Sequence, residues 1–275
     1  MRTRRFGPLD VEIPVLGLGT WNLEQDDRAQ AIATLRRGIE LGMVHIDTAE
    51  MYGDGQAEEI VGAAIAGWRE RLFLVSKVLP QHARAAACKR ACEASLRRLG
   101  TDHLDLYLLH WRGAVPLAET IGAFEALAAE GKIRAWGVSN FDDADLDEVW
   151  RIAPGKVACN QVLYHLLDRT IEHRVIPWCE QHRVAVVAYS PFGSGDGFPQ
   201  SAALDAVAAR LGATPRQVAL AYLTRRPSVF AIPKTGRVAH AEEIAGADRV
   251  TLDAAALAAL DAAFPLAPWR GLPMI

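Results

Sequence analysis

The stretch LFLVSK at residues 72–77 and the stretch LDLYLL at residues 104–109, separated by a segment with helical spacing, decide the fold class. Both are continuous apolar runs, so we predict parallel strands that are buried on both faces and covered by helices. Six further runs follow the same pattern: VLGLG (15–19), VHID (44–47), IRAWGVS (133–139), VACNQ (157–161), VAVVAYS (184–190) and VFAIPK (229–234). Because strand, helix, strand crossovers are right-handed, eight in series are expected to close as a (β/α)8 barrel, the TIM-barrel fold.

Segments outside the eight units lie at the two ends of the chain. The first, RTRRFGPLDVEI (2–13), is a candidate β-hairpin with Gly7 and Pro8 in its turn. An extra helix is expected at TLDAAALAALDAAF (251–264), followed by a Pro-rich tail that we expect to cover one end of the barrel. No linker or low-complexity segment divides the chain, so residues 1–275 are predicted to form a single domain.

Composition argues against several classes of partner. The 275 residues carry a formal net charge of -3 with both signs interspersed, which gives no basic stripe for nucleic acid. The N-terminal segment lacks the apolar stretch of a signal peptide, and the longest apolar runs are too short to cross a bilayer. The four cysteines form neither a disulfide framework nor a CxxC zinc motif, so we expect reduced thiols, no metal site and a cytoplasmic protein.

A doubly wound sheet that binds a dinucleotide at a glycine-rich turn is the main alternative fold. Two segments that follow predicted strands approach its GxGxxG fingerprint, GLGTWN (17–22) and GSGDGF (193–198). Asn and Phe stand where the third glycine belongs, and that glycine allows the close packing of helix on strand. Neither segment therefore supports the alternative.

Four polar residues lie at or just beyond the ends of three successive predicted strands: Asp47, Tyr52, Lys77 and His110. Active sites of (β/α)8 barrels lie at the carboxyl ends of the strands, so we expect these side chains to meet at one mouth. A lysine and an aspartate are costly to bury separately but tolerable as an ion pair. A charged Lys77 is expected to lower the pKa of Tyr52 from about 10, which favours proton donation. His110 is expected to orient a carbonyl oxygen.

Each of these residues also has a structural explanation when it is taken alone. His110 fits a buried histidine with satisfied hydrogen bonds, Tyr52 fits an exposed turn residue, and Lys77 with Asp47 fits a structural ion pair. Packing alone gives no reason to place all four at one rim. The group is therefore interpreted as a site that protonates an oxyanion.

The sequence resembles the aldo-keto reductases, in particular short prokaryotic members that reduce aldehydes, ketones or methylglyoxal. The resemblance rests on motifs in order and spacing along the chain: GLGTW (17–21), HIDTAEMYG (45–53), LVSK (74–77), LLHW (108–111), GKIRAWGVSNF (131–141), NQ (160–161), YSPFG (189–193) and IPKTGR (232–237). It implies a (β/α)8 barrel that uses NADPH to reduce carbonyl compounds to alcohols. It also implies that Tyr52 is the proton donor, tuned by Lys77 and Asp47, and that His110 positions the substrate.

The resemblance assigns a cofactor site as well. Ser139, Asn140 and Gln161 are expected at strand ends, holding the nicotinamide carboxamide, and Tyr189 is expected to stack under the ring. The loop SPFGSGDGFPQ (190–200) is expected to cover the pyrophosphate with its backbone N–H groups. The full expected set is Gly19, Thr20, Asp47, Ser139, Asn140, Gln161, Tyr189, Ser190, Pro191, Phe192, Gly193, Lys234, Thr235, Arg237 and Glu243.

Two positions depart from the family pattern at the adenosine end. Lys234, Thr235 and Arg237 are expected to contact the 2'-phosphate, but His240 stands where the family often has arginine, and Ile244 where it often has asparagine. An imidazole cannot form the forked hydrogen bonds of a guanidinium. NADPH is therefore expected to be preferred by a smaller margin than usual, with NADH use possible.

The substrate side is expected to be an apolar slot between Trp21 and Trp111, beside Tyr52 and His110. The loops that carry specificity in the family are short here, which favours small aldehydes, 2-oxoaldehydes such as methylglyoxal, or keto sugars. We expect a monomer acting on a small molecule, without nucleic acid or membrane. Two other functions stay open: a regulatory protein that keeps the fold and cofactor, and a barrel isomerase or lyase, which would leave the nucleotide motifs unexplained.

Overall fold

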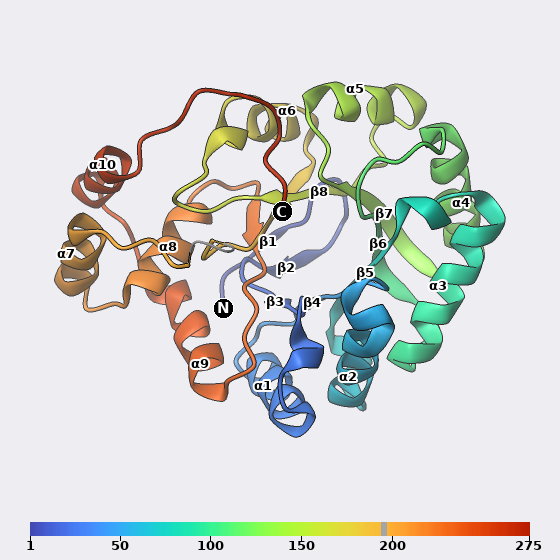
Figure 1. Ribbon diagram of the computed structural model, residues 1–275, viewed down its shortest axis with the longest axis horizontal. Coiled ribbons are helices and arrows are strands. Elements are labelled where there is room, and N and C mark those ends of the chain that lie inside the picture. Colours follow the sequence, from blue (N-terminus) through green and yellow to red (C-terminus); the bar gives the residue numbers. More distant parts are fainter. Residues whose placement is uncertain (194–196) are drawn as a thin grey trace.

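Eight parallel strands form the centre of the structure, a computed structural model that describes residues 1–193 and 197–275 (Figure 1). Their order in the sheet is their order in the chain: β3 (Leu18–Gly19), β4 (His45–Asp47), β5 (Phe73–Val78), β6 (Leu104–Leu109), β7 (Ile133–Ser139), β8 (Cys159–Leu163), β9 (Ala185–Tyr189) and β10 (Val229–Ala231). The first and last strands also meet, because Gly17 N donates to the Ala231 carbonyl at 2.8 Å and Gly19 N donates to the Pro233 carbonyl at 3.0 Å. The predicted (β/α)8 class is confirmed.

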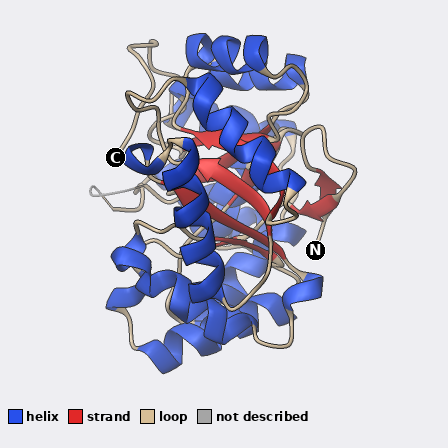
Figure 2. Cartoon of the chain, turned by 90° about the vertical axis from the view of Figure 1, so that its right-hand side faces the viewer, coloured by secondary structure: helices blue, strands red, loops and turns tan. Residues whose placement is uncertain are grey.

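Helices surround the sheet and cover its outer face, as the continuous apolar strands require (Figures 1 and 2). They are α1 (Arg28–Glu40), α2 (Gln56–Ile65), α3 (Ala85–Leu99), α4 (Leu117–Ala129), α5 (Asp143–Ile152), α6 (Val175–His182), α7 (Ala202–Leu211), α8 (Pro215–Leu223), α9 (Val238–Gly246) and α10 (Ala254–Ala263). Short 3-10 helices are η1 (Leu23–Gln25), η2 (Tyr52–Gly55), η3 (Arg69–Arg71), η4 (Pro80–His82), η5 (Thr170–Glu172) and η6 (Ala247–Arg249). Across the described ranges, no helix is long and apolar enough to cross a membrane.

Several element boundaries differ from the sequence prediction. The first strand is limited to Leu18–Gly19 rather than 15–19, although Val15 still accepts a hydrogen bond from Ala231 N at 2.9 Å. The sixth strand runs over Cys159–Leu163 rather than 157–161, so Gln161 lies in its middle and not at its end. Apolar runs in a barrel continue into the connecting loops, so they do not mark where strand pairing begins or ends.

The predicted hairpin closes the end of the barrel where the strands begin. Strands β1 (Thr3–Arg5) and β2 (Glu12–Pro14) pair antiparallel. Between them, Phe6 is fully buried, with its ring centroid 5.1 Å from that of Phe73 and 5.0 Å from that of Phe230. Aromatic packing of this kind fills the end of the barrel where the strands begin. The C-terminal end of the chain lies on the other side of the molecule (Figure 2).

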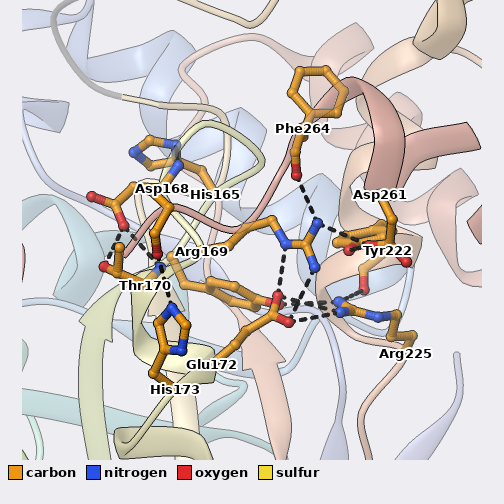
Figure 3. Close-up of polar contacts among 12 residues, drawn as sticks. His165, Asp168, Arg169, Thr170, Glu172, His173, Tyr222, Arg225, Asp261 and Phe264 are labelled. Atoms are coloured by element: carbon orange, nitrogen blue, oxygen red, sulfur yellow. Dashed lines mark hydrogen bonds and ion pairs between the residues drawn. The ribbon is translucent and has the colours of Figure 1, made fainter. Parts of the chain in front are cut away.

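A charged cluster anchors the C-terminal segment to the barrel (Figure 3). Glu172 accepts hydrogen bonds from Arg169 Nε at 2.9 Å, Arg225 Nη2 at 3.2 Å and Tyr164 Oη at 2.6 Å. Arg169 Nη1 in turn donates to the carbonyl of Phe264 at 2.8 Å, where α10 ends. From this anchor the tail returns across the barrel mouth, and its end reaches the mouth as the sequence led us to expect (Figure 1).

Replacing the central carboxylate tests this cluster. Burial alone raises the pKa of Glu172, but the hydrogen bonds from Arg169 and Tyr164 and the charge of Arg225 bring it down to about 2. A carboxyl with a lowered folded-state pKa stabilises the protein above its unfolded pKa and loses that effect as the pH falls. Glu172→Gln should therefore lower the free energy of unfolding by about 3 kcal/mol at neutral pH, with the difference shrinking as the pH falls from about 4.5 towards 2.

Denaturant unfolding of both proteins across this pH range is the measurement. Glu180→Gln is the matched control, since Glu180 pairs with Arg226 at the protein surface, where such pairs contribute about 0–1 kcal/mol. A loss in Glu172→Gln no larger than in the control, or one that does not change with pH, would contradict the anchoring role.

Candidate active site

A cavity of about 130 Å³ opens at the carboxyl ends of the strands. The four predicted residues are not all in its wall: Asp47, Tyr52 and His110 line it, whereas Lys77 lies behind Asp47 and Tyr52 and is fully buried. The wall is completed by Gly19, Thr20, Trp21, Met51, Trp111, Ser139, Asn140, Gln161, Tyr189, Ser190, Ile232, Lys234, Met274 and Ile275. The predicted substrate residues Trp21 and Trp111 thus share one cavity with predicted cofactor residues.

Asp47, Lys77 and Tyr52 form one hydrogen-bonded group. Asp47 ends β4, Lys77 lies in β5, and Tyr52 begins η2 just after β4. The Lys77 ammonium lies 2.5 Å from Asp47 Oδ1, 3.0 Å from the Thr48 carbonyl oxygen and 3.1 Å from Tyr52 Oη. All three donors of the ammonium are therefore used, and two of the partners, Asp47 and Tyr52, lie in the cavity wall.

The charges in this group act in opposing directions. Burial lowers the pKa of Lys77, but Asp47 and Tyr52 outweigh that effect and hold the pKa above its ordinary value, so the ammonium is charged. Burial raises the pKa of Tyr52, Lys77 lowers it and Asp47 raises it, and the net pKa lies above the ordinary value. The expectation of a lowered Tyr52 pKa is therefore wrong, because desolvation of the phenolate exceeds the attraction of Lys77.

His110 follows β6 and faces Tyr52 edge-on, with ring centroids 5.8 Å apart. Burial, assisted by the charge of Lys77, lowers the pKa of His110 to about 2, so the imidazole is neutral at physiological pH. A neutral ring carries one N–H donor and one acceptor nitrogen. Nδ1 is buried and has no hydrogen-bond partner in the part of the chain that the structure describes.

The three residues expected to hold the carboxamide, Ser139, Asn140 and Gln161, all line the cavity, but their side chains form hydrogen bonds within the protein. Gln161 Nε2 donates to Asp47 Oδ2 at 2.7 Å, so this amide orients the ion pair, which the expectation of a carboxamide ligand did not include. Ser139 Oγ donates to the Gln161 carbonyl at 2.8 Å, and Asn140 Nδ2 donates to the His110 carbonyl at 3.1 Å. Tyr189 Oη donates to Asn140 Oδ1 at 2.8 Å. The side chains from four strands are thus linked around the cavity.

Backbone strain occurs at the same rim. Asn140 and Ser190, the residues after β7 and β9, have φ of 61° and 46°. Left-handed conformations at non-glycine residues are unfavourable and cluster at functional sites, where the surrounding structure holds them. They turn the chain so that both residues line the cavity.

A second cavity, of about 280 Å³, adjoins the first at Lys234, which lines both. Its other lining residues are Phe192, Gly193, Gly197, Phe198, Arg216, Thr235, His240, Glu243 and Ile244. Two predicted residues, Pro191 and Arg237, line neither cavity, and Arg237 is exposed as the N-cap of α9. Residues 194–196 of the predicted pyrophosphate loop lie outside the described residues.

Sequence reasoning missed several residues of these walls. It also missed Asp26, which lies outside both walls but whose Oδ2 is 2.6 Å from Nζ of the predicted Lys234, a pair that joins the loop after η1 to the loop after β10. Arg216 reaches the second cavity from α8, and Met274 and Ile275 reach the first from the tail. No motif marks these residues. Arg216 follows a Thr-Pro helix start, which indicates the helix but not the cavity that its side chain reaches.

Comparison with known proteins agrees with this geometry. The family described as Aldo/keto reductase family matches residues 15–264. The chain belongs to the aldo-keto reductase family. It is an oxidoreductase, and the family membership that the sequence motifs predicted is confirmed.

Three relatives are informative. Methylglyoxal reductase YeaE of Escherichia coli (strain K12) is 48% identical over 263 residues, which cover 93% of each chain. NADH-specific methylglyoxal reductase of the same strain is 31% identical over 225 residues, 71% of this chain and 68% of that protein. The crystal structure of an aldo/keto reductase from Klebsiella pneumoniae in complex with NADP and acetate is 49% identical, covers 99% of both chains and superposes with a TM-score of 0.95.

Proposed function

We propose that this protein reduces small aldehydes and ketones to alcohols with NADPH, and that Tyr52 donates the proton. One observation carries the proposal: the hydroxyl of Tyr52 lies in the cavity wall with a charged, fully buried Lys77 behind it at 3.1 Å and a neutral His110 beside it. In this arrangement the Tyr52 hydroxyl and the His110 N–H can both donate to one substrate oxygen atom. A regulatory protein would not require it.

The two cavities fit the two ends of a dinucleotide. The first offers the aromatic face of Tyr189 and the polar groups of Ser139 and Asn140, which suit a nicotinamide carboxamide. The second offers Lys234 and Thr235, which suit phosphate on the adenosine ribose. When bound, the reduced nicotinamide supplies a hydride to the carbonyl carbon. The NADP complex of the Klebsiella relative supports this assignment.

The side chains of the protein provide the proton and stabilise the charge that develops during the reaction. The raised pKa of Tyr52 keeps its Oη protonated at physiological pH, so the proton is present before reaction. As negative charge grows on the substrate oxygen, Oη transfers this proton, and the Lys77 ammonium stabilises the phenolate that is left. His110 donates its N–H to the same oxygen and shares the developing charge. Asp47 and Gln161 hold the ammonium in position.

The walls of the first cavity favour a small substrate. Trp21 and Trp111 form its apolar sides, and Met274 and Ile275 reach it from the tail. Such walls leave room for a compact carbonyl compound beside the tyrosine hydroxyl. Methylglyoxal, other 2-oxoaldehydes, simple aldehydes and keto sugars meet this requirement, and the two methylglyoxal reductases among the relatives support the first.

Removing the phenolic hydroxyl tests the proton donor. Tyr52→Phe should lower kcat by roughly 10²–10⁴-fold, the usual contribution of a positioned acid, while the Kd for NADPH stays within about twofold. Tyr107→Phe is a matched control, because Tyr107 Oη is buried, lines neither cavity and has no hydrogen-bond partner among the described residues. Steady-state kinetics and nucleotide titration give both quantities. Activity retained in Tyr52→Phe would overturn the assignment.

A carbonyl panel tests the substrate class. We expect kcat/KM for methylglyoxal and small aldehydes to exceed that for bulky steroid ketones by at least tenfold, because Trp21 and Trp111 narrow the cavity. Trp21→Ala should reduce this ratio by widening one wall. A wild-type enzyme that prefers the steroid ketones, or a ratio insensitive to Trp21→Ala, would refute the small-substrate proposal.

A further inference from the structure

Two cationic side chains of the second cavity, Lys234 and Arg216, differ in how much of their positive charge is available to bind an anion. Lys234 is the cation that the family motif supplies, but its ammonium is 2.6 Å from Asp26 Oδ2. The Asp26 carboxylate is packed against Gly236, where a Cβ atom would approach the same oxygen to 2.2 Å. The absence of a side chain at Gly236 lets the carboxylate lie this close to the turn, where it offsets the charge of Lys234 at the cavity wall.

Arg216 carries a guanidinium with no such partner. No carboxylate forms an ion pair with it in the ranges 1–193 and 197–275. Its guanidinium carbon lies 5.0 Å from the ring centroid of Phe198, which also lines the second cavity. This contact holds the guanidinium over an aromatic face and leaves its N–H groups available for a ligand.

The backbone of Arg216 is fixed against the helix on the other side of the cavity. Its neighbours Thr214 and Gln217 form a capping box at the start of α8. Thr214 Oγ1 donates to Glu243 Oε1 at 2.6 Å, and Gln217 Nε2 donates to the Glu243 carbonyl at 2.9 Å. These bonds tie α8 to α9 on both sides of Arg216, so its side chain starts from a defined place beside His240 and Glu243.

We propose that Arg216 selects NADPH by binding the 2'-phosphate with forked, charge-assisted hydrogen bonds. It thereby supplies from α8 the guanidinium that position 240 of α9 lacks. This inference rests on the proposed function. A phosphate monoester near neutral pH carries close to two negative charges and three acceptor oxygens, which the neutralised Lys234 alone satisfies poorly. The carboxylate of Glu243 accepts a hydrogen bond from Thr214 and forms no ion pair with Arg216, so Arg216 is a cation of this cavity without a carboxylate partner among the described residues.

Adenosine fragments isolate this contact without catalysis. Adenosine 2',5'-bisphosphate and 5'-AMP share the base and ribose and differ in the 2'-phosphate. In Arg216→Ala we expect calorimetric Kd for the bisphosphate to rise roughly tenfold to a hundredfold, as for a lost hydrogen bond between charged groups, with Kd for 5'-AMP changed less than about twofold. Adding His240→Arg to Arg216→Ala should restore most of the lost affinity.

Arg210→Ala is the control for net charge, since Arg210, on α7, pairs with Asp253 at the start of α10 and lines neither cavity. Equal losses for the two fragments would show that Arg216 binds the base rather than the phosphate and would overturn the proposal. An unchanged Kd for the bisphosphate would do the same while leaving NADPH as cofactor. A wild-type protein that binds neither fragment nor NADPH would refute the proposed cofactor itself.

Discussion

The buried ion pair between Lys77 and Asp47 is the constraint on which the active site depends. Two charges at the centre of an apolar barrel are unfavourable unless each is fully satisfied. Lys77 uses its three donors on Asp47, Thr48 and Tyr52, and Asp47 also accepts from Gln161. The positions of the phenol and the amide are thus consequences of satisfying the pair. A site that met this requirement in another way would place its acid elsewhere.

The second constraint is the closure of the barrel mouth. The cluster around Glu172 fixes the end of α10 through Arg169, and the tail then reaches the cavity with Met274 and Ile275. The Asp26–Lys234 pair links the loops after η1 and β10, and Lys234 lies where the two cavities meet. Polar contacts outside the group of Asp47, Lys77, Tyr52 and His110 therefore shape the space around it. The barrel places the proposed catalytic residues at rigid strand ends, and these contacts hold the loops and tail whose residues line the cavity.

Much of this structure could be predicted from the sequence, for identifiable reasons. Continuous apolar strands determine the parallel barrel, and the polar residues that interrupt them at Asp47, Lys77 and His110 mark the strand ends. The place of Gln161 was not predictable, because the apolar pattern continues past it into the strand. The sign of the Tyr52 pKa shift depends on how deeply the phenol is buried, which a sequence does not encode locally. Arg216 lines the second cavity from α8 and Asp26 pairs with Lys234 from the loop after η1, contacts between distant segments that no motif reveals.

A double-mutant cycle in kcat for carbonyl reduction measures whether Lys77 acts through the proton of Tyr52. One change is Tyr52→Phe; the other is Lys77→Met together with Asp47→Asn, which removes both charges and leaves no unpaired carboxylate buried. NADPH titration first verifies that each variant binds the cofactor. We expect that losing the ion pair lowers kcat strongly when Tyr52 is present and hardly at all in the Tyr52→Phe background. Equal losses in both backgrounds would contradict it.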